Sequence, residues 1–183
     1  MSCPYNTIGE CMVRALFPGT FDPIHYGHID IAIRASKLFD EVVMAVYDKP
    51  SKSLMFSPEE RISLVKEAFK DNSKITITGY SGLTVEFARK IGTQVIVRGL
   101  RVFSDFEFEF RMALANHRLA DDIEIVALIT AEEHTFLSST TVREIALLNG
   151  NISSMVPPFV EKAFQAKVAE MGDQTSVPNS LRD

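Results

Sequence analysis

The chain has 183 residues and a mass of 20.4 kDa, a length that accommodates one domain. Apolar residues make up 46% and charged residues 23%, which is typical of a globular protein and excludes a disordered one. The net charge of −5 argues against a protein that coats nucleic acid or an anionic membrane, because such binding needs many Lys and Arg contacts. It does not exclude one small anionic ligand held by a few cations.

The sequence predicts neither a membrane helix nor an N-terminal signal peptide. No apolar run approaches the roughly 18 residues of a membrane helix, and the N-terminus lacks the pattern of a signal peptide. Cys3 and Cys11 form neither a disulfide framework nor a metal-binding spacing. We predict a cytoplasmic protein with an extension over residues 1–10, a domain over 11–171 and a disordered tail over 172–183.

Short runs rich in Val and Ile alternate with helical patterns along the chain. The runs predict parallel strands over Cys11–Phe17, Glu41–Tyr47, Lys74–Thr78, Gln94–Val97 and Glu124–Ile129. Apolar residues three and four apart predict helices over His28–Phe39, Pro58–Lys70 and Leu83–Ile91. The second of these helices begins with a capping box, in which Ser57 is the N-cap and Glu60 lies three residues later.

The later part of the chain is mostly helical. Residues 102–110 fit both a strand and a helix, and we favour a helix because Phe103, Phe106 and Phe110 share one helical face and Arg111–Leu119 continues the pattern. A last helix is expected from the Pro157-Pro158 pair to about Met171. The alternation predicts an α/β fold, a doubly wound, mostly parallel five-stranded sheet with helices on both faces and ligands at the carboxyl ends of its strands.

The segment after the first strand carries the first candidate site. Pro18 is expected to end the strand, and Gly19 permits a tight turn and the close approach of a ligand. Thr20 then supplies a hydroxyl, and Gly27 and His28 open the next helix, whose free N–H groups attract anions. A histidine there can donate a hydrogen bond to a phosphoryl oxygen. We favour phosphate binding.

Two other interpretations of this segment stay open. It can be a plain strand–helix turn with packed or solvated histidines. It can also hold a metal, since His25 and His28 lie three residues apart, although zinc requires a third ligand and no carboxylate or Cys of the segment is an obvious candidate.

Two further segments follow later strands. Arg98 and Arg101, at the end of the fourth strand, suit a polyphosphate, although an exposed arginine pair is as common. The run Ser138-Ser139-Thr140-Thr141 precedes a helical stretch over Val142–Leu148 and can be a simple N-cap or a cradle for phosphates. Lys52 by itself is a solvated loop lysine.

These motifs resemble a known family. The string GTFDPIHYGH is similar to the (H/T)xGH motif of the nucleotidyltransferase superfamily, which implies adenylyl or cytidylyl transfer. The string RGLR followed by DFEFEF resembles the bacterial phosphopantetheine adenylyltransferases, and the match runs from Ala15 to about Lys167. The resemblance implies a Rossmann-like fold of the nucleotidyltransferase type.

The resemblance also implies roles for individual residues. His28 would stabilise the transition state, with Lys52 and Arg101 as further catalytic residues. The acceptor would be bound by Thr20, Lys52, Thr84 and Arg98. ATP would be bound by Thr20, Phe21, His28, Gly99, Leu100, Arg101, Glu109, His134, Thr135, Phe136, Leu137, Ser138, Ser139 and Thr140.

The implied reaction is the transfer of the adenylyl group of ATP to 4′-phosphopantetheine, which gives dephospho-CoA and pyrophosphate. The resemblance further implies Mg²⁺ carried with ATP, feedback binding of coenzyme A in the same site, and a homohexamer. No nucleic-acid or membrane partner is expected.

Alternatives remain because the chain departs from the family pattern in places. The run SSTTVRE replaces the commoner SSSLVKE and is also similar to nicotinamide or nicotinate mononucleotide adenylyltransferases, and Phe108 stands where the family often has Tyr. The alternatives are another phosphate acceptor such as nicotinate mononucleotide, cytidylyl transfer to a polyol phosphate, a non-catalytic nucleotide sensor and a tRNA-synthetase fragment. Retention of Thr20, His28 and Lys52 argues against the sensor, and the short acidic chain argues against the synthetase fragment.

Overall fold

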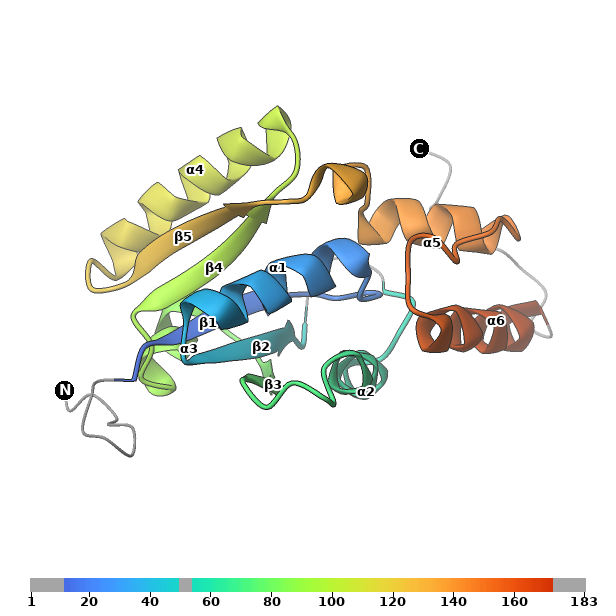
Figure 1. The fold of residues 1–183 in the computed structure, drawn as a ribbon, viewed down its shortest axis with the longest axis horizontal. Coiled ribbons are helices and arrows are strands. Elements are labelled where there is room, and N and C mark those ends of the chain that lie inside the picture. Colours follow the sequence, from blue (N-terminus) through green and yellow to red (C-terminus); the bar gives the residue numbers. More distant parts are fainter. Residues whose placement is uncertain (1–11, 50–53, 173–183) are drawn as a thin grey trace.

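The computed structural model describes residues 12–49 and 54–172 (Figure 1). The predicted extension, Cys3, Cys11, Lys52 and residues 173–183 of the predicted tail lie outside the described residues.

The described part of the chain is organised around one five-stranded sheet. Its strands are β1 (Arg14–Gly19), β2 (Glu41–Tyr47), β3 (Ile75–Tyr80), β4 (Val95–Leu100) and β5 (Glu124–Ile129), in the order β3-β2-β1-β4-β5. All four neighbouring pairs are parallel. The predicted α/β fold with a parallel five-stranded sheet is therefore confirmed.

Within residues 12–49 and 54–172, six α-helices accompany the sheet: α1 (Tyr26–Leu38), α2 (Pro58–Ala68), α3 (Thr84–Lys90), α4 (Phe103–Leu119), α5 (Ser139–Leu147) and α6 (Pro158–Gly172). A short 3₁₀ turn spans Glu132–His134. In Figure 1, α5 and α6 lie beyond the carboxyl ends of the strands. Among the described residues, no helix is long and apolar enough to span a bilayer.

Local sequence explains where two of these helices form. At α2, the Ser57 hydroxyl accepts from the Glu60 N–H at 3.2 Å, and the Glu60 carboxylate accepts from the Ser57 N–H at 2.7 Å, so the predicted capping box is present. The ambiguous segment after β4 is helical, because α4 continues without a break through its good helix formers to Leu119.

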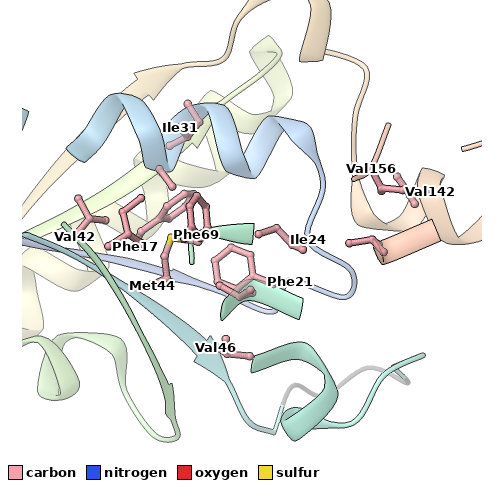
Figure 2. Packing of buried hydrophobic residues seen from close by; sticks show 14 of the residues in the cluster. Phe17, Phe21, Ile24, Ile31, Val42, Met44, Val46, Phe69, Val142 and Val156 are labelled. Carbon is pink, nitrogen blue, oxygen red and sulfur yellow. The ribbon is translucent and has the colours of Figure 1, made fainter. Parts of the chain in front are cut away.

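Side chains that alternate along the strands bury two faces. On one face, Ala15, Phe17, Val42 and Met44 pack in a cluster that includes residues of α1, α2, α5 and α6 (Figure 2). On the other face, a second cluster joins the sheet to α3 and to the segment after α4 through Leu16, Val43, Ala45, Val85, Ala88, Ala120 and Ile123. Helices therefore cover both faces of the sheet, as predicted.

The end of β1 differs from the prediction that Pro18 terminates the strand. β1 pairs with β2 as far as Gly19, whereas its pairing with β4 stops at Leu16. The Pro18 carbonyl faces β4 and accepts from the Arg98 guanidinium at 2.9 Å. In a parallel strand, the N–H and the C=O of one residue point toward the same neighbouring strand. Because the Pro18 carbonyl faces β4, the N–H that proline lacks would also have faced β4. Proline therefore ends the pairing on one side only.

Helix α4 contributes no buried residue to the monomer. Its exposed apolar side chains are Phe103, Phe106, Phe108, Phe110, Met112, Leu114 and Leu119. Phe103, Phe106 and Phe110 stack in sequence on one face, with ring centroids 6.2 and 5.9 Å apart. The predicted face is therefore present, but it is not covered by the described part of the chain.

Candidate active site

The sheet opens between β1 and β4, where the strand order reverses. Such a reversal is the usual place for a ligand in an open α/β sheet. A cavity of about 340 Å³ lies here and is lined by the β1–α1 turn, the end of β4, α4 and the start of α5. The early loss of pairing at Pro18 creates this opening.

The turn after β1 is shaped by Gly19 and Phe21. A Cβ on Gly19 would lie 2.7 Å from Cζ of Phe21, so the buried Phe21 ring occupies the space that any side chain at position 19 would need. Phe21 itself has a positive φ of 51°, which is uncommon for a residue other than glycine. Its ring meets the edge of His28 at a centroid distance of 5.0 Å. The turn thus places a rigid aromatic ring against the candidate catalytic histidine.

His25 and His28 stack on each other inside the cavity, with ring centroids 3.6 Å apart. The backbone N–H of His25 donates to Nδ1 of His28 at 3.3 Å. A nitrogen that accepts is unprotonated, so the proton of the neutral His28 ring is on Nε2. His25 is buried, and its Nδ1 has no hydrogen-bond partner among the described residues.

Both histidines are held neutral. Burial, and then the positive charge of Arg101, lowers the pKa of His25 from 6.5 to about 3. Burial is also the main cause that lowers the pKa of His28 well below its usual range. Electrostatic repulsion from His25, Arg101 and Arg98 lowers this pKa further. A neutral His28 therefore presents an Nε2–H donor without a formal charge.

The two predicted arginines line the cavity, but each is paired with a carboxylate of α4. Arg98 makes two bonds to Glu109, at 2.8 and 2.6 Å, and Arg101 makes two bonds to Asp105, at 2.9 and 3.0 Å. Arg101 also donates to the Leu137 carbonyl at 2.6 Å. A guanidinium has five N–H groups and three are engaged in each arginine, so two on each are left for a ligand.

The hydroxyl run begins α5. Ser138 is the N-cap and accepts from the Thr141 N–H at 3.0 Å. Ser139 donates to the Pro23 carbonyl at 2.9 Å, which joins the run to the β1–α1 turn. Ser138, Ser139 and Thr140 all line the cavity, beside the free N–H groups of the helix.

The cavity unites most of the residues singled out from the sequence. It is lined by Thr20, Phe21, His28, Arg98, Gly99, Arg101, Glu109, Ser138, Ser139 and Thr140. The predicted residues that do not line it are Thr84, Leu100, His134, Thr135, Phe136 and Leu137. Thr84 bonds to the Tyr80 hydroxyl at 3.1 Å, whereas Leu137 is fully buried and contributes its carbonyl to Arg101.

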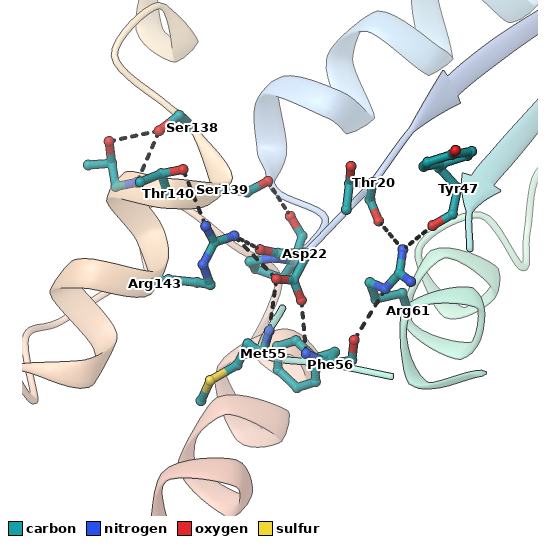
Figure 3. A network of polar contacts seen from close by, with 12 residues as sticks. Thr20, Asp22, Tyr47, Met55, Phe56, Arg61, Ser138, Ser139, Thr140 and Arg143 are labelled. Atoms are coloured by element: carbon teal, nitrogen blue, oxygen red, sulfur yellow. Dashed lines mark hydrogen bonds and ion pairs between the residues drawn. The ribbon is translucent and has the colours of Figure 1, made fainter. Parts of the chain in front are cut away.

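Several residues at the site were not predicted. His25, Asp105 and Thr130 line the cavity. Asp22 is buried and bonded to Arg143 of α5, which lies outside the cavity lining (Figure 3). His25 lies within the motif, and the sequence suggested either a metal ligand or a packed or solvated residue for it. No signal in the sequence indicates the pairing of Asp22 with Arg143, because 121 residues separate the two partners.

Comparison with known proteins gives the family. Residues 16–145 match the cytidylyltransferase-like family. The chain is 50% identical to a phosphopantetheine adenylyltransferase of Roseiflexus sp. (strain RS-1) over 151 residues, which cover 82% of this chain and 94% of that protein. The chain belongs to the phosphopantetheine adenylyltransferase family. It is also 47% identical to the phosphopantetheine adenylyltransferase of Cupriavidus taiwanensis over 159 residues, 87% of this chain and 99% of the relative.

A solved structure supports the fold of this adenylyltransferase. A lipopolysaccharide core biosynthesis protein from Thermoplasma volcanium superposes with a TM-score of 0.50 and 23% sequence identity, over 66% of this chain and 98% of that protein. At this identity the likeness concerns the α/β fold alone.

Proposed function

We propose that the cavity between β1 and β4 binds ATP and 4′-phosphopantetheine together and transfers the adenylyl group between them. An oxygen of the acceptor phosphate forms a bond to the α-phosphorus of ATP. The bond from that phosphorus to the β-phosphate oxygen breaks, and pyrophosphate leaves with the electron pair. The acceptor phosphate is already nucleophilic, so catalysis consists of positioning and of stabilising charge.

The observation that carries this proposal is the position of His28. Its ring lines the cavity at the helix start, and the bond from the His25 N–H leaves Nε2–H as its donor. In the proposed reaction this N–H donates to an α-phosphoryl oxygen as negative charge increases in the transition state. A neutral donor suits this role, since it acts at pH 7 without first taking up a proton.

The pyrophosphate would be held by the other side of the cavity. Arg101 offers its remaining N–H groups there, and the hydroxyls of Ser138, Ser139 and Thr140 stand at the positive end of α5. Gly99, at the end of β4, and Glu109, beside Arg98, line the cavity and would contact ATP. We keep the ATP-binding roles of Phe21, Leu100, His134, Thr135, Phe136 and Leu137 as proposals from the family resemblance.

The acceptor phosphate would be bound by Thr20 and Arg98, which line the cavity. Lys52 would assist as a third group, on the family resemblance. Thr84 begins α3 and lies beside Tyr80, so its proposed role is a contact with the remainder of the acceptor.

Mg²⁺ would come with ATP rather than from a resident site. The cation prefers oxygen ligands and is commonly held by substrate phosphates and one or two carboxylates. The cavity carboxylates, Asp105 and Glu109, each form a bidentate pair with an arginine. In the part of the chain that the structure describes, no three His, Cys, Asp or Glu side chains are grouped to hold a metal. The donor set fits an ion coordinated mainly by ATP.

The function is tested by a panel of substrates. Pyrophosphate release is measured with ATP or CTP against 4′-phosphopantetheine, nicotinate mononucleotide and glycerol phosphate. We expect activity with ATP and 4′-phosphopantetheine. Activity with the mononucleotide alone would overturn the proposed acceptor, and binding of ATP without any turnover would favour a sensor.

Two further proposals concern assembly and regulation. We propose that the exposed aromatic face of α4, with Ile129 of β5, is covered by other copies of the chain in a homohexamer. We also propose that coenzyme A binds in the same cavity and competes with substrate, because it contains the product of the transfer as part of its structure.

A further inference from the structure

Arg61 of α2 is fully buried and bonds residues at the edge of the cavity without lining it. Its Nη1 donates to the backbone carbonyls of Thr20 and Tyr47, at 2.8 and 2.7 Å (Figure 3). Its Nη2 donates to the Asp48 carbonyl and its Nε to the Phe56 carbonyl, both at 3.2 Å. Four of the five N–H groups of the guanidinium are therefore engaged, all of them by carbonyl oxygens.

These bonds continue the connection between β1 and β2 beyond the last pair of the ladder. The two strands pair as far as Gly19 and Val46, so Thr20 and Tyr47 are the residues that come next. Nη1 of Arg61 bridges the carbonyls of these two residues, at the point where the backbone leaves β1. The start of the β1–α1 turn is thereby fixed relative to the end of β2.

The segment before α2 is fixed at the same place. The carbonyl of Phe56 accepts from Arg61. The N–H groups of Met55 and Phe56 donate to the buried carboxylate of Asp22, at 3.0 and 2.9 Å. The β1–α1 turn, the end of β2 and the segment before α2 are therefore joined into one hydrogen-bonded unit.

Within this unit, the side chain of Thr20 is left for a ligand. Thr20 lines the cavity, and its hydroxyl makes no hydrogen bond to any of the residues that the structure describes. Its carbonyl is instead engaged by Arg61, which lies outside the cavity lining. A carbonyl oxygen only accepts and repels a phosphate, whereas a hydroxyl can donate to one. Capture of the carbonyl therefore fixes Thr20 with its hydroxyl as the group available to a phosphate.

We propose that Arg61 is a positioning residue for the acceptor: by holding the Thr20 carbonyl at the end of β2, it presents the Thr20 hydroxyl to the acceptor phosphate. The inference rests on the proposed function of the cavity, in which Thr20 binds that phosphate. Arg61 acts through the backbone and does not itself line the cavity. A lysine cannot replace it, because one ammonium nitrogen cannot stand where three guanidinium nitrogens bond four carbonyls.

The test measures the dissociation constants (Kd) of 4′-phosphopantetheine and of ATP by calorimetry, each without the other substrate, so that no turnover occurs. Arg61→Lys keeps the buried charge and loses the bonds that need three nitrogens. Its Kd for 4′-phosphopantetheine should rise by about tenfold or more, the loss of one hydrogen bond to a charged group. Its Kd for ATP should stay within about twofold of the wild type, because the ATP phosphates are proposed to bind at Arg101 and the start of α5.

A double-mutant cycle shows whether Arg61 acts through Thr20. Thr20→Val removes the hydroxyl at similar volume and leaves the backbone carbonyl in place. It should raise the Kd for 4′-phosphopantetheine by a factor similar to that of Arg61→Lys. The double variant should bind the acceptor hardly more weakly than Thr20→Val alone, because both substitutions remove the same contact.

Arg14→Lys serves as the matched control. Arg14 is a partly buried arginine at the other end of β1, where it bonds the Glu41 carboxylate at 2.7 Å and the Ile91 carbonyl at 2.6 Å. Thermal unfolding is measured for all variants. Arg14→Lys should lower Tm, as Arg61→Lys does, while its Kd values for both substrates stay within about twofold of the wild type.

The outcomes are distinguishable. A merely structural role for Arg61 predicts a lower Tm with both Kd values unchanged or raised by the same factor, and either result would overturn the positioning role. Losses that multiply in the double variant would overturn it as well. A wild-type chain that releases no pyrophosphate from ATP and 4′-phosphopantetheine would overturn the proposed function instead.

Should Arg61→Lys not fold, the comparison of the wild type with Thr20→Val decides. A rise of fivefold or more in the Kd for 4′-phosphopantetheine, with the Kd for ATP unchanged, would support the inference. A smaller rise would overturn it, because Arg61 would then have no acceptor contact to position.

Discussion

The backbone N–H of His25 donates to Nδ1 of His28 at 3.3 Å, and this contact decides which nitrogen of the His28 ring carries the proton. With Nδ1 occupied as an acceptor, the neutral ring donates through Nε2. The first histidine of the motif therefore acts on the second through its backbone, while its own ring stacks on that of His28. The two histidines together thus present one uncharged N–H donor, Nε2–H of His28, to the cavity.

Substitution of His28 tests the role of this N–H donor directly. His28→Ala should lower kcat by a factor on the order of 10² to 10³, because one donor to the developing charge is lost. The affinity for ATP should remain close to that of the wild type, since the arginines and hydroxyls that hold its phosphates are retained. Single-turnover kinetics and calorimetric ATP binding measure the two quantities. A variant with nearly normal turnover would contradict the role of His28.

The burial of His25 predicts a loss of stability in acid. Its pKa is about 3 in the folded chain and about 6.5 when unfolded, so the unfolded state binds more protons between these values. The free energy of unfolding should therefore fall as the pH drops from about 6.5 toward 3, by at most about 1.4 kcal/mol per pH unit for this residue. His28, whose pKa is also lowered, adds to the slope.

Urea denaturation at pH 7 and pH 5 measures this effect. His25→Gln should show a shallower loss of stability over that interval than the wild type. His117→Gln is the matched control, because it makes the same chemical change at a histidine that is exposed on α4. Equal slopes for His25→Gln and the wild type would show that His25 does not resist protonation in the folded state.

Gly19→Ala should damage both stability and turnover. The new Cβ would lie within 3.0 Å of three atoms of the Phe21 ring, which is buried and cannot move freely. Overpacking of this kind costs about 1–3 kcal/mol, and displacement of Phe21 would shift its neighbour His28. We expect kcat to fall by more than about tenfold, since small displacements of a catalytic group are costly.

Gly79→Ala is the control for this substitution. Its Cβ would meet only the flexible end of Ile62 closely, at 3.1 Å, and Gly79 lies on β3, outside the cavity lining. Its turnover should be close to that of the wild type. Normal kinetics and stability for Gly19→Ala would mean that the Phe21 ring does not restrain His28.

The exposed face of α4 predicts self-association. Phe106 is 49% exposed and lies at the centre of the stacked ring series. Phe106→Lys should dissociate the proposed hexamer, because it would bury a charge at the contact. Sedimentation should give the wild type six times the mass of the 20.4 kDa chain and the variant a smaller mass. A monomeric wild type would contradict the proposal.

Local sequence patterns determined most of the fold. The alternation of apolar runs and helical periodicity predicted all five strands and the helices between them, because these signals depend on residues only a few positions apart. The bounds of β2 and β5 are as predicted, and the other boundaries differ by at most three residues: β4, for example, runs to Leu100 rather than Val97. The predicted break at Pro18 was wrong for one side of the strand, since only the pairing partners decide whether its missing N–H matters.

The sequence by itself also determined the chemistry of the candidate site. Thr20, His28, Arg98, Arg101 and the hydroxyl run follow strands of a parallel sheet, so their meeting at one edge follows from the topology. The net charge of −5 argued against a protein that coats nucleic acid and was compatible with a small anionic ligand. These conclusions require only the types of residue and the edge of the sheet at which the carboxyl end of each strand lies.

Only the tertiary structure decided the charge state and the supports of that site. Two arginines that suggested a cationic pocket are each paired with a carboxylate of α4, and both histidines are neutral because the surrounding protein desolvates their rings. The bond between Asp22 and Arg143 joins segments 121 residues apart. No periodicity in the sequence predicts such a contact, because it depends on how the segment before α2 and helix α5 pack around the β1–α1 turn.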